Sequence, residues 1–304
     1  MITYIGNILK GALMGAANVI PGVSGGTMAL LTGIFEQLIN SIKSFDLTAI
    51  KLAYRFKFKE LFEHINLKFL SAIGIGIIGS ILTVARILDY LFEHHALYVW
   101  SFFFGLILAS VYFVGKKISQ RSITIVLLFA TGTAIAAWIA LLEPATRNES
   151  VPYLILCGAV AMCSMILPGL SGSFVLLLMG NYELVMIEAV NTLNLKVILP
   201  MGIGAAGGLV AFSRILSWVF KKFHDQTIAL LTGFIFGSLA ILWPWKVAVI
   251  TTFQKGNEIK EKVTGYEYTL PELNAETGMA LAIMLAGIVI IALVEILAGK
   301  KNAD

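Results

Sequence analysis

Six apolar runs, each close to 20 residues long, limit what this chain can fold into. They cover residues 69–88, 97–115, 123–142, 197–219, 228–246 and 279–298. A run of this length with few charges is typical of a helix that spans a lipid bilayer. The composition agrees, because only 13% of the 304 residues are charged, against about 25% in an average soluble domain. We therefore predict an all-α polytopic membrane protein.

Two further apolar segments, 8–42 and 153–190, are interrupted near their middle. Each contains the pattern Pro-Gly-x-Ser-Gly, at residues 21–25 and 168–172. Proline removes a backbone donor and glycine loosens the backbone, so a regular helix cannot continue through either pattern. The flanks are short for full spans. We predict that both segments are re-entrant hairpins, each made of a half-helix, an unwound turn and a second half-helix.

The positions of lysine and arginine set the predicted orientation. The loop 43–68 carries six of them, so it is expected on the cytoplasmic side of the membrane. If each hairpin enters and leaves on one side, the basic loops 116–121 and 221–225 also lie inside, and the loop 247–277 lies outside. The net charge of +4 then reports topology, and we expect no nucleic-acid partner.

The chain is internally duplicated. An offset of 147 residues aligns residues 20–25 with 167–172, and an offset of 128 aligns the glycine pattern of 74–79 with that of 202–207. The glycine spacing also matches a dinucleotide-binding fingerprint. Since it lies within a predicted membrane helix, we interpret it as a means of close helix packing.

The duplication divides the chain into residues 1–145 and 146–304. Each half holds one hairpin and three spans, and because three is odd, the halves are expected to have opposite orientations. Inverted repeats with broken helices are typical of transporters whose binding site lies near the bilayer midplane, between the repeats.

The two turns are the predicted binding site. Each turn precedes a half-helix, whose N-terminus presents unpaired N–H groups and a partial positive charge. Glycines let an oxygen approach the backbone and hydroxyls add donors, a combination that suits a phosphate or carboxylate. The alternative is that the turns are only kinks. The predicted phosphate-binding residues of the turns are Asn18, Pro21, Gly22, Ser24, Gly25, Gly26, Thr27, Pro168, Gly169, Ser171, Gly172 and Ser173.

Two pairs of charged residues complete the predicted site. Arg86 and Arg214 occupy matching positions near the ends of two spans. A guanidinium binds phosphate bidentately, so each could receive the anion at one membrane face; the alternative is snorkelling to the interface. Glu36 and Glu183 also match. A carboxylate in an apolar setting is costly unless it is protonated or paired. The two glutamates could therefore couple transport to protons, and sodium is the other candidate ion. The alternative is that they lie at helix ends that are exposed to water.

The stretches PGVSGGT (21–27) and PGLSGS (168–173), together with two Arg-Ile-Leu segments, resemble the PopT-type polyprenyl-phosphate transporters. This bacterial membrane family is catalogued as domain of unknown function 368, and the resemblance covers essentially the whole chain. It implies a flippase of the bacterial plasma (inner) membrane that returns undecaprenyl phosphate from the outer to the inner leaflet for cell-wall polymer synthesis. The second copy departs from the first, with Ser173 and Phe174 in place of Gly26 and Thr27.

Two other functions use the same residues. One is an ion-coupled transporter of a small anion. The other is an intramembrane lipid phosphatase, which would need a histidine beside the phosphate. Both turns lack histidine, and His224 lies well beyond Ser213 and Arg214, whose order resembles the start of a phosphatase motif. We therefore predict a transporter without catalytic residues, metal or cofactor.

Overall fold

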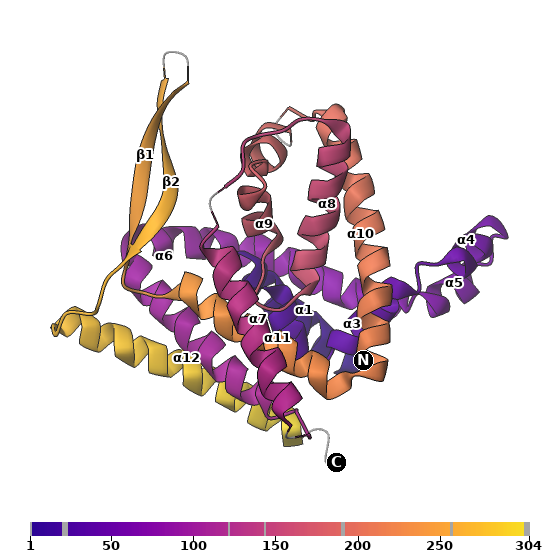
Figure 1. Cartoon of the computed structure of the whole chain (residues 1–304). Coiled ribbons are helices and arrows are strands. Elements are labelled where there is room, and N and C mark those ends of the chain that lie inside the picture. Colours follow the sequence, from indigo (N-terminus) through magenta and orange to yellow (C-terminus); the bar gives the residue numbers. More distant parts are fainter. Residues whose placement is uncertain are drawn as a thin grey trace.

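The computed structural model describes residues 2–19, 24–120, 122–142, 144–189, 192–255 and 258–300. Figure 1 shows a helical molecule from which one two-stranded hairpin projects. In chain order, the elements are α1 (Ile2–Val19), α2 (Gly25–Leu31), α3 (Phe35–Lys43), α4 (Leu47–Tyr54), α5 (Phe58–His64), α6 (Leu67–Gly115), α7 (Ile123–Ala140), α8 (Val151–Ile166), α9 (Gly172–Leu178), the π-helix η1 (Glu183–Ala189), α10 (Leu195–Lys222), α11 (His224–Leu242), β1 (Lys246–Lys255), β2 (Glu258–Tyr268) and α12 (Ala275–Lys300).

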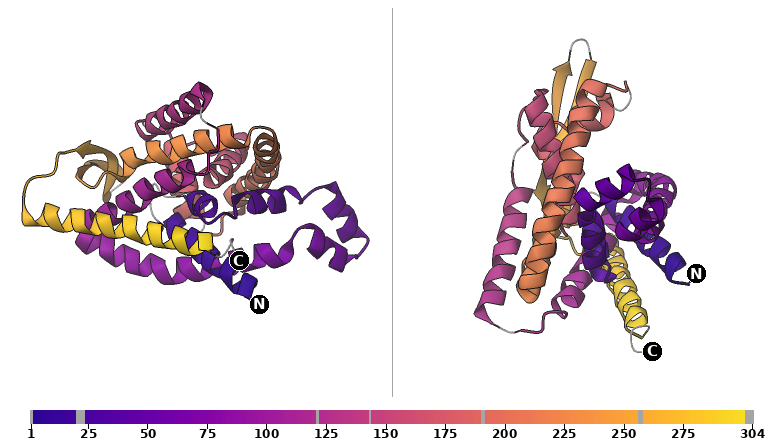
Figure 2. Two further views of the ribbon diagram at one scale, coloured as in Figure 1. Left: turned by 90° about the horizontal axis from the view of Figure 1, so that it is seen from below. Right: turned by 90° about the vertical axis from the view of Figure 1, so that its right-hand side faces the viewer.

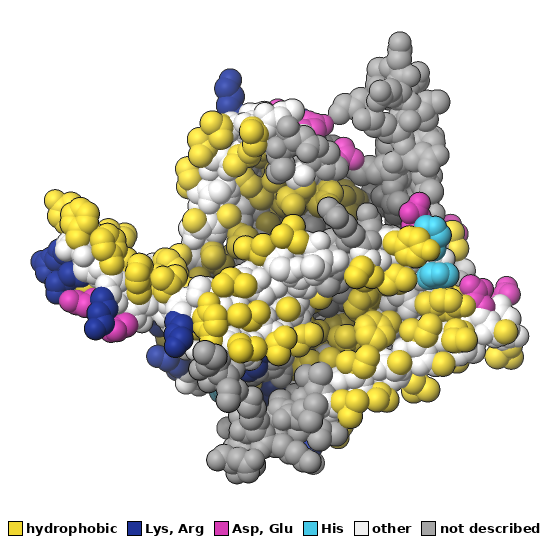
Figure 3. Space-filling view, turned by 180° about the vertical axis from the view of Figure 1, so that it is seen from behind, with side chains coloured by type: hydrophobic (Ala, Val, Ile, Leu, Met, Phe, Trp, Pro, Cys, Tyr) yellow, Lys and Arg dark blue, Asp and Glu magenta, His cyan; other side chains and the backbone are white. Residues whose placement is uncertain are grey.

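Within these described ranges, five helices are long and apolar enough to cross a membrane. A sixth results if α5 and the start of α6, which are bent by 67° relative to each other, count as one span. Hydrophobic side chains cover much of the face of the molecule that Figure 3 shows. Large apolar side chains of the long helices are exposed; Leu82 is 69% exposed and Leu285 61%. Lipid is the environment that such a surface fits. The prediction of an all-α polytopic membrane protein is confirmed for the helices, and the two-stranded hairpin of β1 and β2 is the exception.

The predicted spans 69–88 and 97–115 are not separated by a loop. They belong to α6, in which the helical geometry is broken at His95 (φ −140°, ψ 38°). The rings of Phe92 and Trp100 lie 5.1 Å apart, although eight residues of straight helix rise about 12 Å. The break therefore folds α6 into two arms, and the polar residues before His95 continue the helix.

The predicted span 228–246 ends earlier, at Leu242, and the predicted loop 247–277 contains a β-hairpin. Pro244 explains the helix end, because a residue before proline avoids the helical region, and Trp243 is extended with ψ 123°. The strands β1 and β2 pair in antiparallel register, from Lys246 opposite Tyr268 to the far end, with one irregularity after Val249.

Glycines bring equivalent helix pairs into close contact in the two halves. A Cβ atom on Gly11 of α1 would overlap the carbonyl oxygen of Ile73 on α6, and one on Gly158 of α8 would overlap that of Met201 on α10. The two contacts are equivalent in the repeat, because the offset of 147 residues relates Gly11 to Gly158 and the offset of 128 relates Ile73 to Met201. Gly204, in the second glycine pattern, meets the backbone of Ile155 in the same way. The interpretation of the glycine patterns as packing surfaces is confirmed for this position.

The last helix of each half packs against the other half. Helix α7 packs on α11, where a Cβ on Gly233 would overlap the carbonyl oxygen of Phe129. Helix α12 packs on α6, where a Cβ on Gly105 would overlap the carbonyl oxygen of Met284. Figure 2 shows α12 and α6 side by side. The two halves are therefore interlocked.

Candidate functional site

The two interrupted segments have the same local geometry where their second helices begin. Helix α2 starts at Gly25 after Ser24, whose Oγ accepts a hydrogen bond from the Gly26 N–H at 3.1 Å. Helix α9 starts at Gly172 after Ser171, whose Oγ accepts from the Phe174 N–H at 3.2 Å. Both serines are extended N-caps, the role for which serine is preferred. The sequence predicts that the half-helices begin at Gly26 and Ser173, directly after the two turns, and the observed helices begin one residue earlier.

The two turns touch each other. The Thr27 hydroxyl accepts a hydrogen bond from the Gly169 N–H at 3.0 Å, and the Ser24 hydroxyl donates to the Leu167 carbonyl at 3.1 Å and to the Met165 carbonyl at 3.2 Å. Ser24 and Thr27 are fully buried. The sequence predicts that the turns converge, and their described parts do so by direct hydrogen bonding.

The backbone segments approach each other so closely in this contact that Gly26 and Gly169 have no room for a side chain. A Cβ on Gly26 would overlap the carbonyl oxygen of Ile166, the last residue of α8 before the other turn. Gly169 has φ +84°, and its Cβ would lie 2.6 Å from the carbonyl oxygen of Phe234 on α11. Glycine is the residue that tolerates such a φ. The second turn is thus held between the first turn and α11.

The remaining predicted turn residues have different surroundings. The Asn18 Oδ1 accepts from the Gly25 N–H at 2.8 Å, so Asn18 holds the start of α2. Pro168 is fully buried. Ser173 is exposed, and its hydroxyl lies 3.3 Å from that of Ser171. Pro21 and Gly22 lie outside the described residues.

Two lysines that the sequence analysis did not select bind the other end of α2. Lys117 Nζ donates to the Leu30 and Leu31 carbonyls at 3.0 and 3.1 Å, and Lys10 Nζ donates to the Thr32 carbonyl at 2.9 Å. A cation is stabilising at this end, where the helix dipole is negative. Lys10 could have been found, since it is the charge that interrupts the first apolar segment.

The predicted arginines are not joined to the contact between the turns. Arg214 is exposed on α10, and its guanidinium has no hydrogen bond or ion pair within the described part of the chain. The side chain of Arg86 lies outside the described residues. Their role as countercharges stays a prediction.

The predicted glutamates are both exposed. Glu36, on α3, has its Oε1 3.3 Å from the Nε2 of His224 at the start of α11. Glu183 begins η1. The sequence places both carboxylates in an apolar setting, whereas the exposure of both side chains also fits wet helix ends. Proton coupling through this pair stays a prediction.

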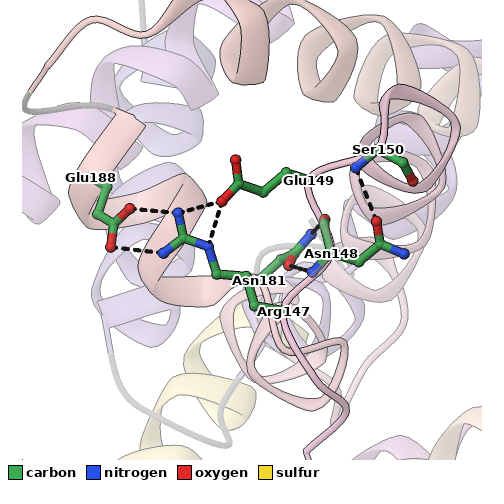
Figure 4. A network of polar contacts seen from close by, with 6 residues as sticks. All are labelled: Arg147, Asn148, Glu149, Ser150, Asn181 and Glu188. Carbon is green, nitrogen blue, oxygen red and sulfur yellow. Dashed lines mark hydrogen bonds and ion pairs between the residues drawn. The ribbon is translucent and has the colours of Figure 1, made fainter. Parts of the chain in front are cut away.

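A polar network outside the predicted site fixes the connection between the halves (Figure 4). Arg147 donates to both carboxylate oxygens of Glu188 at 2.8 and 2.7 Å, and also pairs with Glu149. Asn181 is fully buried; it accepts from the Asn148 N–H at 2.9 Å and donates to the Asn148 carbonyl at 2.7 Å. The network binds residues 147–149 to the chain after α9, so it braces the second interrupted segment.

Comparisons with known proteins agree with the resemblance seen in the sequence. Residues 14–260 match the family described as undecaprenyl phosphate translocase-like. A polyprenyl-phosphate transporter of Vibrio cholerae is 37% identical over 295 residues, which cover 95% of this chain and 96% of that protein. A polyprenyl-phosphate transporter of Staphylococcus aureus is 33% identical over 257 residues, which cover 78% and 86%. No solved structure matches the chain.

The family match spans both interrupted segments, and the first relative aligns over nearly the full length of both chains. The resemblance that the sequence analysis drew from residues 21–27 and 168–173 is thereby confirmed. This chain belongs to the undecaprenyl phosphate translocase-like family.

Proposed function

We propose that this protein transports polyprenyl phosphate across the bacterial plasma membrane. Burying an unpaired phosphate in hydrocarbon is prohibitive, whereas the prenyl tail can remain in lipid. The protein therefore has to supply a polar route for the head alone. The contact between the two turns carries this proposal, because it brings two serine-capped helix starts together in a chain of this family.

The hydrogen bonds across the contact suggest how the head is accepted. They use the Ser24 hydroxyl, the Thr27 hydroxyl and the Gly169 N–H. When the turns separate, these three groups lose their partners together, and phosphate oxygens can take the two donors of Ser24 and Gly169. Exchanging one set of hydrogen bonds for another avoids leaving buried polar groups unsatisfied. The phosphate would thus be bound where the turns part.

The proposal includes an inverted repeat with two re-entrant hairpins. It is supported by the matching glycine contacts of α1 with α6 and of α8 with α10, and by the matching caps of α2 and α9. Single cysteines at the exposed positions Lys51 and Lys196, in a chain without Cys157 and Cys163, test it. We expect an impermeant thiol reagent to label the two from opposite sides of the membrane. Labelling of both from the same side would exclude opposite orientations.

Arg86 and Arg214 are proposed to receive the phosphate at opposite faces. Removing a hydrogen bond to a charged group costs about 1.5–3 kcal/mol, so we expect Arg86→Ala and Arg214→Ala to slow transport about tenfold or more. The measurement is the return of labelled polyprenyl phosphate, normalised to the amount of protein in the membrane. Arg→Lys variants at both positions serve as controls that retain charge. Wild-type rates in both alanine variants would refute the role of these residues.

The proposed direction is from the outer to the inner leaflet, which returns the carrier lipid to cell-wall synthesis. Coupling to protons through Glu36 or Glu183 belongs to the same proposal. The coupling proposal is supported by the contact between Glu36 Oε1 and His224 Nε2 at 3.3 Å, which joins two titratable groups. Transport that is indifferent to a pH gradient would refute the coupling without affecting the transport function.

A further inference from the structure

The helices α4 and α5 form an arm, residues 45–64, that projects away from the other helices (Figures 1 and 2). Large apolar side chains on the arm are strongly exposed: Leu47 is 72% exposed, Ile50 65%, Tyr54 85%, Phe56 78% and Phe58 50%. So many exposed apolar side chains on one short segment mark a surface that meets something other than water.

The exposed apolar side chains are arranged on faces of the two helices. Leu47, Ile50 and Tyr54 follow the spacing i, i+3 and i+7 on α4, and Phe58 and Phe62 follow i and i+4 on α5. Residues at these spacings share one side of a helix. Each helix of the arm is therefore amphipathic, and its apolar side lacks a covering element in the described protein.

The arm has defined local structure. Asp46 caps α4, because its Oδ1 accepts from the Thr48 and Ala49 N–H groups at 2.8 and 3.0 Å. The Nε2 of His64, at the end of α5, lies 3.1 Å from the same carboxylate. The contact joins the two ends of the arm. The hydrogen bonds to the carboxylate, that to Ala49 first, keep the pKa of Asp46 below its ordinary value, so the cap persists at neutral pH.

The arm also exposes cations. Lys51, Arg55 and Lys59 are exposed, and none forms an ion pair with the rest of the described chain. Two of the three acidic residues are already engaged, Asp46 by His64 and Glu60 by Lys57 at 2.7 Å. Figure 3 shows hydrophobic side chains along one edge of the arm and charged ones along the other. Apolar faces beside unpaired cations complement a bilayer surface that carries anionic headgroups.

We propose that the arm is an interfacial anchor, which inserts its apolar faces into the cytoplasmic leaflet and binds anionic phospholipid headgroups through Lys51, Arg55 and Lys59. The 67° bend between α5 and the start of α6 directs the arm away from the axis of that helix, as an element lying along the membrane surface requires. The proposal rests on the cytoplasmic placement of loop 43–68 in the proposed topology. It assigns the arm to the lipid surface rather than to a second copy of the chain.

The test uses a fluorophore that is sensitive to polarity, attached to a single cysteine at position 56 in the full chain without Cys157 and Cys163. The protein is reconstituted into vesicles of phosphatidylcholine alone or with one quarter phosphatidylglycerol. We expect blue-shifted emission that doxyl-labelled lipids quench, and stronger quenching in the anionic vesicles. A label at Glu63, which is exposed and does not share the spacing of Phe58 and Phe62 on α5, is the matched control and is expected to stay in water.

Charge reversal separates the electrostatic part of the anchor from the apolar part. Each basic group near an anionic surface strengthens binding about fivefold. We therefore expect the triple variant Lys51→Glu, Arg55→Glu, Lys59→Glu to reduce quenching in anionic vesicles at least to the level in phosphatidylcholine. Lys196→Glu, which changes a cation outside the arm, is expected to leave quenching unchanged.

Three outcomes would overturn the proposal. The label at position 56 could report water in both kinds of vesicle, the triple variant could quench like the wild type, or the emission could depend on protein density rather than on lipid, which would indicate contact between copies.

Fluorescence does not report transport, so an anchored arm in a protein that moves no polyprenyl phosphate would contradict only the proposed function. Quenching lost while transport persists would contradict only the anchor.

Discussion

The Gly26→Ala variant is expected to lose transport and to yield much less folded protein than the wild type. The added Cβ would overlap the Ile166 carbonyl oxygen, which is a backbone atom at the end of α8 and cannot rotate aside. Overpacking at a tight site costs about 1–3 kcal/mol, and here it also forces apart the contact that we propose opens only for phosphate. Thermal unfolding of detergent-purified protein and the return of labelled lipid measure the two effects.

Gly202→Ala is the matched control for this substitution. Gly202 also lies in a helix, but a Cβ there would meet nothing within 4 Å. Since alanine is favoured over glycine inside a helix by about 1 kcal/mol, the control is expected to keep full transport and stability. If Gly26→Ala behaved like Gly202→Ala, the close contact between the turns would not exist in the membrane.

The Thr27→Val variant is expected to have the second largest effect. Valine keeps the shape of threonine but removes the oxygen that accepts the Gly169 N–H. Leaving a buried donor without its partner costs about 1–3 kcal/mol. We expect a lower melting temperature and slower transport, whereas Thr27→Ser retains the hydroxyl and is expected to lie close to the wild type in both measurements.

The control for the hydroxyl is Thr131→Val. Thr131 is exposed on α7, and its hydroxyl donates only to the Leu127 carbonyl of its own helix at 2.8 Å. The same change of atoms should therefore have little effect at that position. Equal losses in Thr27→Val and Thr131→Val, or equal losses in Thr27→Val and Thr27→Ser, would show that the cross-turn hydrogen bond is unimportant.

The features that the sequence predicted well depend on local chemistry. Proline, glycine and serine interrupt a helix and cap the next one through groups only a few residues apart, so the starts of α2 and α9 were predicted to within one residue. The break in α6 at His95 lies between the two predicted spans, but the polar residues before it form helix and not the loop that they resemble, since histidine and glutamate are compatible with a helix. Pro244 is the local signal in the sequence for the end of α11, four residues before the end of the predicted span.

The details of the candidate site depend on contacts between distant segments. The duplication predicted that the turns meet, but it did not show that Thr27 would bind Gly169. Neither the carbonyls that Lys10 and Lys117 bind nor the partners of Asn181 follow from spacing along the chain. Such partners are set by the packing of whole helices, and the sequence reveals only that a polar group in an apolar segment needs one.

The exchange of α7 and α12 between the halves determines which parts can move as units. Because α7 packs on α11 and α12 packs on α6, a rocking motion that kept residues 1–145 together would break two tightly packed helix pairs. Less disruptive motions carry α6 with α12 and α7 with α11. The mobile bodies of this protein would then differ from the two predicted repeats, residues 1–145 and 146–304, because each body would contain helices from both of them.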